Sequence, residues 1–125
     1  MCSGLRPVDD GRSVVGDGGF AMLMAELATA VLQDLPVKVL ILNNGRLAEV
    51  AFEQCEAGFG VFGCELSPID FVAYAKACGP DGFLCEKPEE IRPAIMSAFR
   101  SPKPAIVEAN VDPDEQPRKP GEVKV

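Results

Sequence analysis

The chain has 125 residues, of which 47% are hydrophobic and 25% are charged, a composition ordinary for one soluble globular domain. Its formal net charge of −7 argues against nucleic acid or an anionic membrane as a partner. No apolar run approaches the roughly 18 residues that span a bilayer, and the first residues suit neither a secretory nor a transit peptide. We therefore expect a cytoplasmic protein without a membrane span.

Histidine is absent from the chain, and its five cysteines form no C-x-x-C pair. Zinc and iron–sulfur sites are therefore not expected. The lack of histidine also removes the commonest general base and every histidine-based catalytic triad. We expect the cysteines to be free thiols that mostly pack as small hydrophobic residues.

The predicted elements of the first half are, in chain order, an irregular leader (1–12), a short strand (13–15), a helix (20–35), a strand (37–42), a turn (43–45), a short helix (46–54) and a glycine-rich loop (55–66). Apolar residues recur from Phe20 to Leu35 at the spacing of one helix face, which predicts one helix that Pro36 ends. The nearly continuous apolar run over 37–42 is typical of a strand buried on both faces.

The predicted elements of the second half are a helix (67–78), a short strand (83–86), a helix opening near Pro88, a strand (105–111) and a charged tail (113–125). Ser67 is the expected N-cap of the first helix, with Pro68 at its first position, and Pro93 favours a start later than Pro88 for the second. Strands alternating with helices predict a single α/β domain over 13–112, a three-layer α/β/α fold with a mostly parallel sheet.

Two polar motifs follow neighbouring strands of this predicted sheet. Gly16, Gly18 and Gly19 surround Asp17 in a G-D-G-G turn, and Asn44 ends the next strand. Because parallel strands present their carboxyl ends side by side, Asp17 and Asn44 are expected to meet at one edge. Carboxylate and amide oxygens suit Mg²⁺, and glycines at a helix start allow a diphosphate to approach the backbone.

Each motif also has a purely structural interpretation. Glycines supply unusual backbone dihedrals in a strand-to-helix turn, and Asp17 could simply cap the following helix. Asparagine tolerates turn conformations, so Asn43-Asn44-Gly45 needs no ligand. The coincidence of the two motifs at one sheet edge favours the cation–phosphate interpretation.

Asp17 with its glycines and Asn44 further along resemble the metal–diphosphate motif of thiamine-diphosphate-dependent enzymes. The segments GDGGFAMLMAELATAV, LPVKVLILNN, FEQ, DFVAYAKACG, EKPEEIRPAI and KPAIVEANVD are similar, in that order, to the C-terminal part of pyruvate oxidases and quinone-dependent pyruvate dehydrogenases. Acetolactate synthases and related 2-oxo-acid decarboxylases are the next nearest. The resemblance covers roughly residues 14–113.

The resemblance implies thiamine diphosphate and Mg²⁺ as cofactors. It implies that the metal ligands are the side chains of Asp17 and Asn44 and the backbone carbonyl of Arg46. The diphosphate would lie on the glycines of the G-D-G-G turn and on the helix start at Phe20. Leu47 matches a position near the thiazolium ring.

The resemblance also implies that parts of the enzyme lie elsewhere. Family members are several times longer, and the glutamate that activates the aminopyrimidine ring belongs to another domain. We therefore expect a domain truncated on its N-terminal side, without catalytic residues of its own, completed by a partner chain or a homo-oligomer. The alternatives are a folded gene fragment that oligomerises and binds no cofactor and, ranked last, a nucleotide-binding regulatory domain.

Overall fold

A computed structural model describes residues 11–114. The elements are β1 (Arg12–Gly16), α1 (Asp17–Leu23), α2 (Glu26–Leu32), β2 (Lys38–Asn43), α3 (Ala48–Glu56), α4 (Phe71–Cys78), β3 (Asp81–Cys85), α5 (Pro88–Arg100) and β4 (Ala105–Asn110). Most of the predicted leader and nearly all of the predicted tail lie outside the described residues. The predicted strands and helices all occur, with shifted ends, except that one predicted helix is divided in two.

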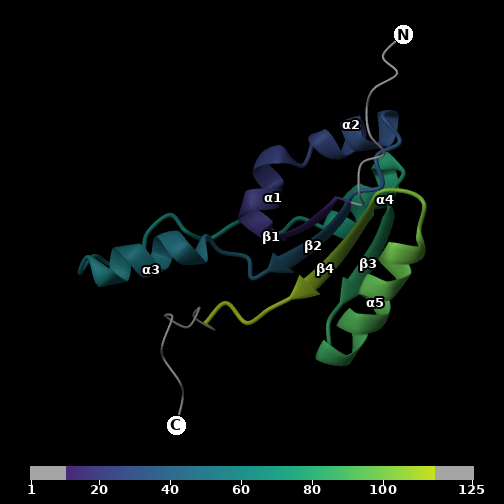
Figure 1. The fold of residues 1–125 in the computed structure, drawn as a ribbon. Helices are drawn as coiled ribbons and strands as arrows, with labels where there is room; N and C mark the ends of the chain where they lie inside the picture. The colour runs from purple at the N-terminus through teal and green to yellow at the C-terminus, as the bar shows by residue number, and fades with distance from the viewer. Residues whose placement is uncertain (1–10, 115–125) are drawn as a thin grey trace.

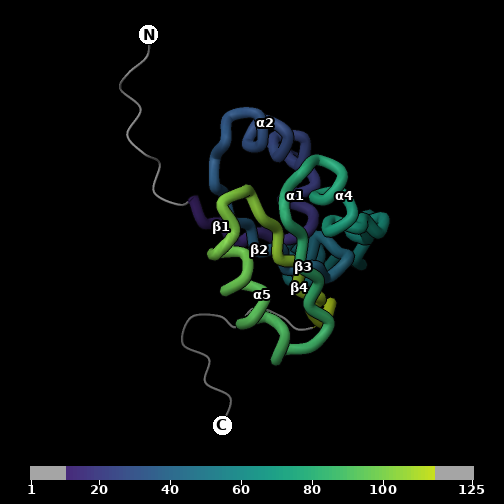
Figure 2. Tube along the Cα trace, turned by 90° about the vertical axis from the view of Figure 1, so that its right-hand side faces the viewer, coloured from purple at the N-terminus to yellow at the C-terminus, as the bar shows by residue number. Residues whose placement is uncertain are grey.

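The four strands form one all-parallel sheet in the order β1-β2-β4-β3. One face packs against α1, α2 and α4 through a core cluster that includes Ile41, Phe71 and Ile106. The other face packs against α5 through a cluster that includes Ala98 and Val107. Figure 2 shows these two helical layers on opposite sides of the strands. The predicted three-layer α/β/α fold is therefore confirmed.

The sheet brings the carboxyl ends of β1 and β2 to the same edge. Gly16, the last residue of β1, is in register with Leu42, one residue before β2 ends. The chain then leaves β2 toward α3, which lies beyond the carboxyl ends of the strands and away from both helical layers (Figure 1). Residues that follow β1 and β2 are consequently neighbours at this edge.

The predicted single helix over 20–35 is wrong, because the helix is interrupted between α1 and α2. The Met24 carbonyl accepts from Leu27 N at 3.1 Å, an i→i+3 bond, and from the Tyr74 hydroxyl at 2.7 Å. Ala28 N likewise bonds three residues back, to the carbonyl of Ala25. Where a continuous α-helix would make i→i+4 bonds, the Met24 carbonyl instead accepts from an amide three residues on and from a side chain of α4.

Two predicted helix starts are corrected by the structure. The N-cap of α4 is Asp70, not Ser67, because the Asp70 carboxylate accepts from Ala73 N at 2.7 Å. Helix α5 does begin at Pro88 although Pro93 lies inside it. Proline is suited to the first helical position, and Glu90 Oε2 accepts from Lys87 N at 3.1 Å, which secures the start.

No helix among the described residues is long and apolar enough to cross a membrane. The four cysteines of this part of the chain are free thiols, as predicted. Cys64 and Cys85 are buried, whereas Cys55 is exposed. Burial raises the pKa of the Cys85 thiol, and the nearby Glu90 carboxylate raises it further.

We predict that Asp70→Ala lowers the free energy of unfolding by about 1 kcal/mol, the usual cost of losing an N-cap side chain. Ser67→Ala is the matched control and should change it by less than about 0.5 kcal/mol, as expected for an exposed residue that caps no helix. Urea denaturation of both variants measures the difference. Equal losses in the two variants would show that Ser67 contributes to the cap.

We also predict that Cys85 is alkylated by iodoacetamide far more slowly than Cys55 in the folded protein, since the thiolate is the reactive form and burial disfavours it. Because the pKa of Cys85 is raised in the folded state, the unfolded chain releases this proton first as the pH rises. Stability should therefore fall above the ordinary thiol range of about 8.5. Mass spectrometry of tryptic peptides checks the first expectation and urea denaturation against pH the second.

Candidate functional site

Asp17 is the first residue of α1 and directly follows β1. It does not cap the helix: the N-cap is Gly16, and no side chain makes a capping hydrogen bond there. Its side chain is buried, with only 5% of the residue exposed. The carboxylate oxygen Oδ2 instead accepts from Gly45 N at 2.9 Å. Asp17 therefore holds the turn after β2 rather than its own helix.

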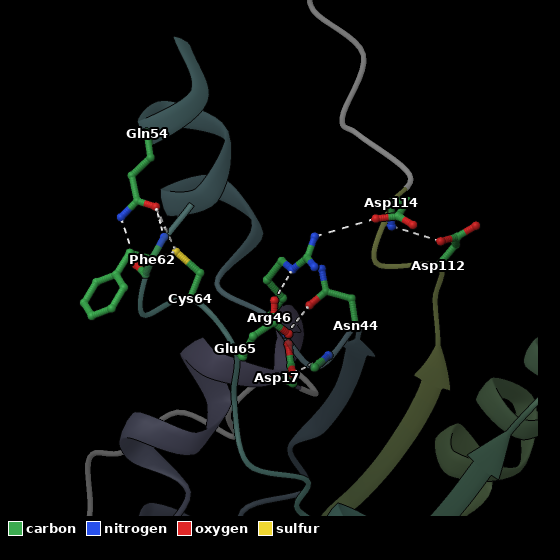
Figure 3. A network of polar contacts seen from close by, with 10 residues as sticks. Asp17, Asn44, Arg46, Gln54, Phe62, Cys64, Glu65, Asp112 and Asp114 are labelled. Atoms are coloured by element: carbon green, nitrogen blue, oxygen red, sulfur yellow. Dashed lines mark hydrogen bonds and ion pairs between the residues drawn. The ribbon is translucent and has the colours of Figure 1, made fainter. Parts of the chain in front are cut away.

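The turn after β2 places two asparagine side chains in different roles. Asn43 Oδ1 accepts from the same Gly45 N–H at 3.1 Å, while its Nδ2 donates to Glu108 Oε1 at 2.7 Å. Asn44 Oδ1 accepts from Arg46 N at 3.0 Å. Figure 3 shows Asp17 lying against the turn that carries Asn44 and Arg46. The structure thus brings the G-D-G-G and Asn-Asn motifs together at one edge.

The chain beyond this turn is tied back to the residues that follow α3. Leu66 N donates to the Gly45 carbonyl at 2.9 Å, and Leu47 N donates to the Cys64 carbonyl at 2.8 Å. Between these bonds the Arg46 side chain pairs with Glu65 at 2.9 Å, as Figure 3 shows. We name these two facing segments, 45–47 and 64–66, the neck. The neck joins α3 to the body and sets the path of Arg46, whose carbonyl is the predicted third ligand.

The glycines of the G-D-G-G turn differ in their surroundings. Gly16 has open space where a side chain would begin, and Gly19 is exposed, with Val15 as its nearest neighbour. A Cβ on Gly18 would lie 2.6 Å from Leu47 Cδ2 and 3.1 Å from Leu66 Cδ1. A larger residue at position 18 would therefore force the ends of the Leu47 and Leu66 side chains to move away from α1.

Two further predicted cofactor residues lie on different sides of α1. The Phe20 ring packs edge-on against Phe71, with ring centroids 5.4 Å apart, so this side chain belongs to the core. Leu47 covers Gly18 at the start of α1. Of the two, the structure brings Leu47, and not the Phe20 ring, to the Asp17 edge.

A cavity of about 140 Å³ opens beside Asp17, with walls that include Asn43, Gly45, Leu66 and Phe71. Between residues 11 and 114 there is no group of three or more cysteine, histidine, aspartate or glutamate side chains placed to hold a metal. Any cation at this edge would therefore have at most two such side chains as ligands and would depend on neutral oxygens and the ligand's own charges for the rest. Such a mixed set, completed by phosphate oxygens and water, is common for Mg²⁺.

Glu65, which pairs with Arg46, and Glu108, which accepts a hydrogen bond from Asn43, were not predicted from the sequence. No pattern in the sequence points to Glu65, because its partner Arg46 lies 19 positions away and only the fold of the neck brings the two residues together. For Glu108 there is such a pattern: it is a charged residue flanked by apolar residues in strand β4. A carboxylate in a buried strand indicates a specific partner.

Residues 5–109 match the sequence family of the C-terminal TPP-binding domain of thiamine pyrophosphate enzymes. The match spans most of the chain and contains every predicted site residue. The chain belongs to this family. Its resemblance to thiamine-diphosphate-dependent enzymes is thereby confirmed.

Individual relatives agree with this assignment. The chain is 38% identical over 111 residues to YdaP of Bacillus subtilis, named as a putative thiamine pyrophosphate-containing protein; the match covers 89% of the chain and 19% of YdaP. It is 34% identical over 105 residues to the catabolic acetolactate synthase of Raoultella terrigena, covering 84% of the chain and 19% of that enzyme. The chain thus spans about a fifth of the length of these relatives.

A solved structure shares the fold. It is the thiamine diphosphate-dependent 4-hydroxybenzoylformate decarboxylase of Rhodococcus jostii RHA1, with a TM-score of 0.77 and 28% sequence identity. The match covers 88% of this chain and 21% of the decarboxylase chain. The all-parallel sheet with its two helical layers is therefore an arrangement that a thiamine diphosphate enzyme also has.

We predict that Gly18→Ala lowers the free energy of unfolding by about 1–3 kcal/mol, because the added methyl group overpacks the contact with Leu47 and Leu66. Gly16→Ala is the control: its backbone lies at φ −72° in open space, so it meets no steric clash and should lose at most about 1 kcal/mol, because alanine is less favoured than glycine at an N-cap. Urea denaturation measures both. Adding Leu47→Ala to Gly18→Ala should recover part of the loss, and no recovery would argue against the steric explanation.

Proposed function

We propose that this domain binds thiamine diphosphate together with Mg²⁺ at the edge formed by Asp17 and the turn after β2. The observation that carries the proposal is the 2.9 Å bond between the Asp17 carboxylate and Gly45 N, in a chain whose family is the TPP-binding domain. This bond places the acidic residue against the residue that separates Asn44 from Arg46. The metal ligands would be the Asp17 carboxylate, the Asn44 side-chain oxygen and the Arg46 carbonyl.

The donor set suits magnesium. One carboxylate, one amide oxygen and one carbonyl oxygen leave room in an octahedral shell for phosphate oxygens and water. The bond from Arg46 N to Asn44 Oδ1 does not exclude coordination, because an amide oxygen has two lone pairs. The same bond would hold the amide oxygen and the Arg46 backbone in a fixed relation within one tight turn.

The diphosphate would lie at the start of α1, where backbone N–H groups are free of helical partners. Gly16 and Gly19 leave the backbone open to such an approach, whereas Leu47 covers Gly18. Because the buried Asp17 carboxylate repels a bare diphosphate, we expect the cation and the cofactor to bind together. When bound, thiamine diphosphate supplies the stabilised carbanion chemistry of its thiazolium ring.

We further propose that this domain is not catalytically complete by itself and acts within a larger enzyme that converts 2-oxo acids, of the pyruvate oxidase or acetolactate synthase type. Its relatives are about five times longer, since the chain matches 19% of their length. The remainder of the cofactor site would come from another domain, from a partner chain or from a second copy in a homo-oligomer.

The alternative is a folded domain that self-associates and binds no cofactor. It is favoured by apolar side chains left uncovered next to β1, where Val14 is 67% and Leu23 is 70% exposed. Exposed apolar side chains gathered along one sheet edge are typical of a surface that another chain covers. Cofactor titration separates the two proposals.

We predict that titration with thiamine diphosphate in the presence of Mg²⁺ gives a saturable heat in isothermal calorimetry, and that chelating the metal abolishes it. Asp17→Asn keeps an oxygen that can accept from Gly45 N but removes the charge, so affinity should fall about tenfold or more. Glu49→Gln, an exposed charge change on α3, is the control and should bind like the wild type. A saturable heat of cofactor binding in the absence of Mg²⁺, or an unchanged affinity in Asp17→Asn, would refute the proposed site. No heat of binding in the wild type or in either variant would favour the alternative.

A further inference from the structure

Glu108 is a buried carboxylate in β4, one of the two inner strands of the sheet. It is 4% exposed, and five of the six residues of its strand are buried. Its side chain lies in the body of the sheet, one strand away from the proposed cation site. Burying a charge is costly unless the charge is hydrogen-bonded, and Glu108 Oε1 accepts from Asn43 Nδ2 at 2.7 Å.

The bond from Asn43 to Glu108 fixes which way the Asn43 amide faces. An ionised carboxylate can only accept hydrogen bonds, whereas an amide has a donor end and an acceptor end. Glu108 therefore holds the Nδ2 end of Asn43 toward itself and leaves Oδ1 facing the turn. There Oδ1 accepts from Gly45 N at 3.1 Å, the same N–H that binds Asp17 Oδ2 at 2.9 Å.

Gly45 is the point where this orientation matters for the proposed site. Its φ of +68° places it in the left-handed region, and its N–H lies between the two side chains that accept from it. If the Asn43 amide were turned round, its Nδ2 would face the Gly45 N–H as a second donor, its Oδ1 would face the Glu108 carboxylate, and the turn would be held by Asp17 alone. The proposed ligands Asn44 and Arg46 directly precede and follow Gly45 in the chain.

We propose that Glu108 is a positioning residue for the cation site: acting through Asn43, it orients the Gly45 peptide and so presents Asn44 and Arg46 beside Asp17. The inference rests on the proposed function for its cation, but the orientation of the turn can be measured separately. Glu108 touches neither metal nor cofactor in this scheme. Its role is to make one arrangement of the ligand turn more stable than the others.

The experiment reverses the donor and the acceptor of the pair. In Asn43→Asp two carboxylates face each other without a proton donor between them, so the turn should loosen. In the double variant Asn43→Asp/Glu108→Gln the new amide can donate to the new carboxylate, which can still accept from Gly45 N. Glu89→Gln, an exposed charge change in the first turn of α5, is the control.

The first readout is hydrogen exchange of the Gly45 amide at pH 7, followed by NMR, with the Ile106 amide of the core as the reference for global stability. Exchange at Gly45 should become about tenfold faster than in the wild type in Asn43→Asp, relative to Ile106, and return to within about threefold in the double variant. If Asn43→Asp does not fold, the double variant decides. Wild-type exchange in Asn43→Asp, or no recovery in the double variant, overturns the proposal.

The second readout is the affinity for Mn²⁺, a paramagnetic substitute for Mg²⁺, measured by electron paramagnetic resonance with thiamine diphosphate present. Affinity should fall about 10- to 100-fold in Asn43→Asp, the usual range for residues behind the ligands, although this variant adds a negative charge that attracts the cation. It should recover in the double variant, which has the net charge of the wild type. A merely structural role would lower stability without this recovery of affinity. If the wild type binds no metal with the cofactor, the proposed function and the positioning role fail together, while Gly45 exchange still reports whether Glu108 orders the turn.

Discussion

The peptide group of Gly45 is the point on which the carboxyl edge of the sheet depends. Its N–H is shared by the carboxylate of Asp17 and the amide oxygen of Asn43, and its carbonyl accepts from Leu66 N. One residue thus joins the start of α1, the end of β2 and the segment that follows α3. Because a side chain is disfavoured at its φ of +68°, glycine is the residue that makes this junction without strain.

Charge is distributed unevenly between the two ends of the sheet. The charged side chains buried among residues 11–114 are Asp17, Lys38 and Glu108. Lys38 begins β2, and its ammonium group donates to the backbone carbonyls of Ser101 and Lys103, which follow α5. Asp17 and Glu108 are at or near the opposite, carboxyl edge. A buried positive group therefore closes one end of the sheet, while the end that carries the proposed site is negative and suited to a cation.

Much of the fold could be predicted from local patterns. Apolar runs located the strands. The alternation of these strands with helices along the chain indicated a parallel sheet with helices on both faces. The errors arose where tertiary contacts overrode local signals. The periodicity from Phe20 to Leu35 could not reveal that the helix is interrupted after Leu23, next to the Met24 carbonyl that the Tyr74 hydroxyl binds. Ser67 was predicted to cap α4, and only the tertiary structure showed that the helix begins later, with the Asp70 carboxylate accepting from Ala73 N.

For the candidate site, too, some features could be predicted from the sequence and others only from the structure. The sequence by itself indicated that an acidic residue and an asparagine follow two consecutive strands of a mostly parallel sheet, and its motifs were enough to indicate the family. The pairing of β1 with β2, which makes the two residues neighbours, comes from the structure. Only the tertiary structure decided which atoms meet: the Asp17 carboxylate binds the Gly45 N–H, Asn43 binds Glu108, and Leu47 covers Gly18. These contacts join positions far apart in the chain, and hydrogen-bond direction and side-chain packing are settled only when the strands, α1 and the neck come together.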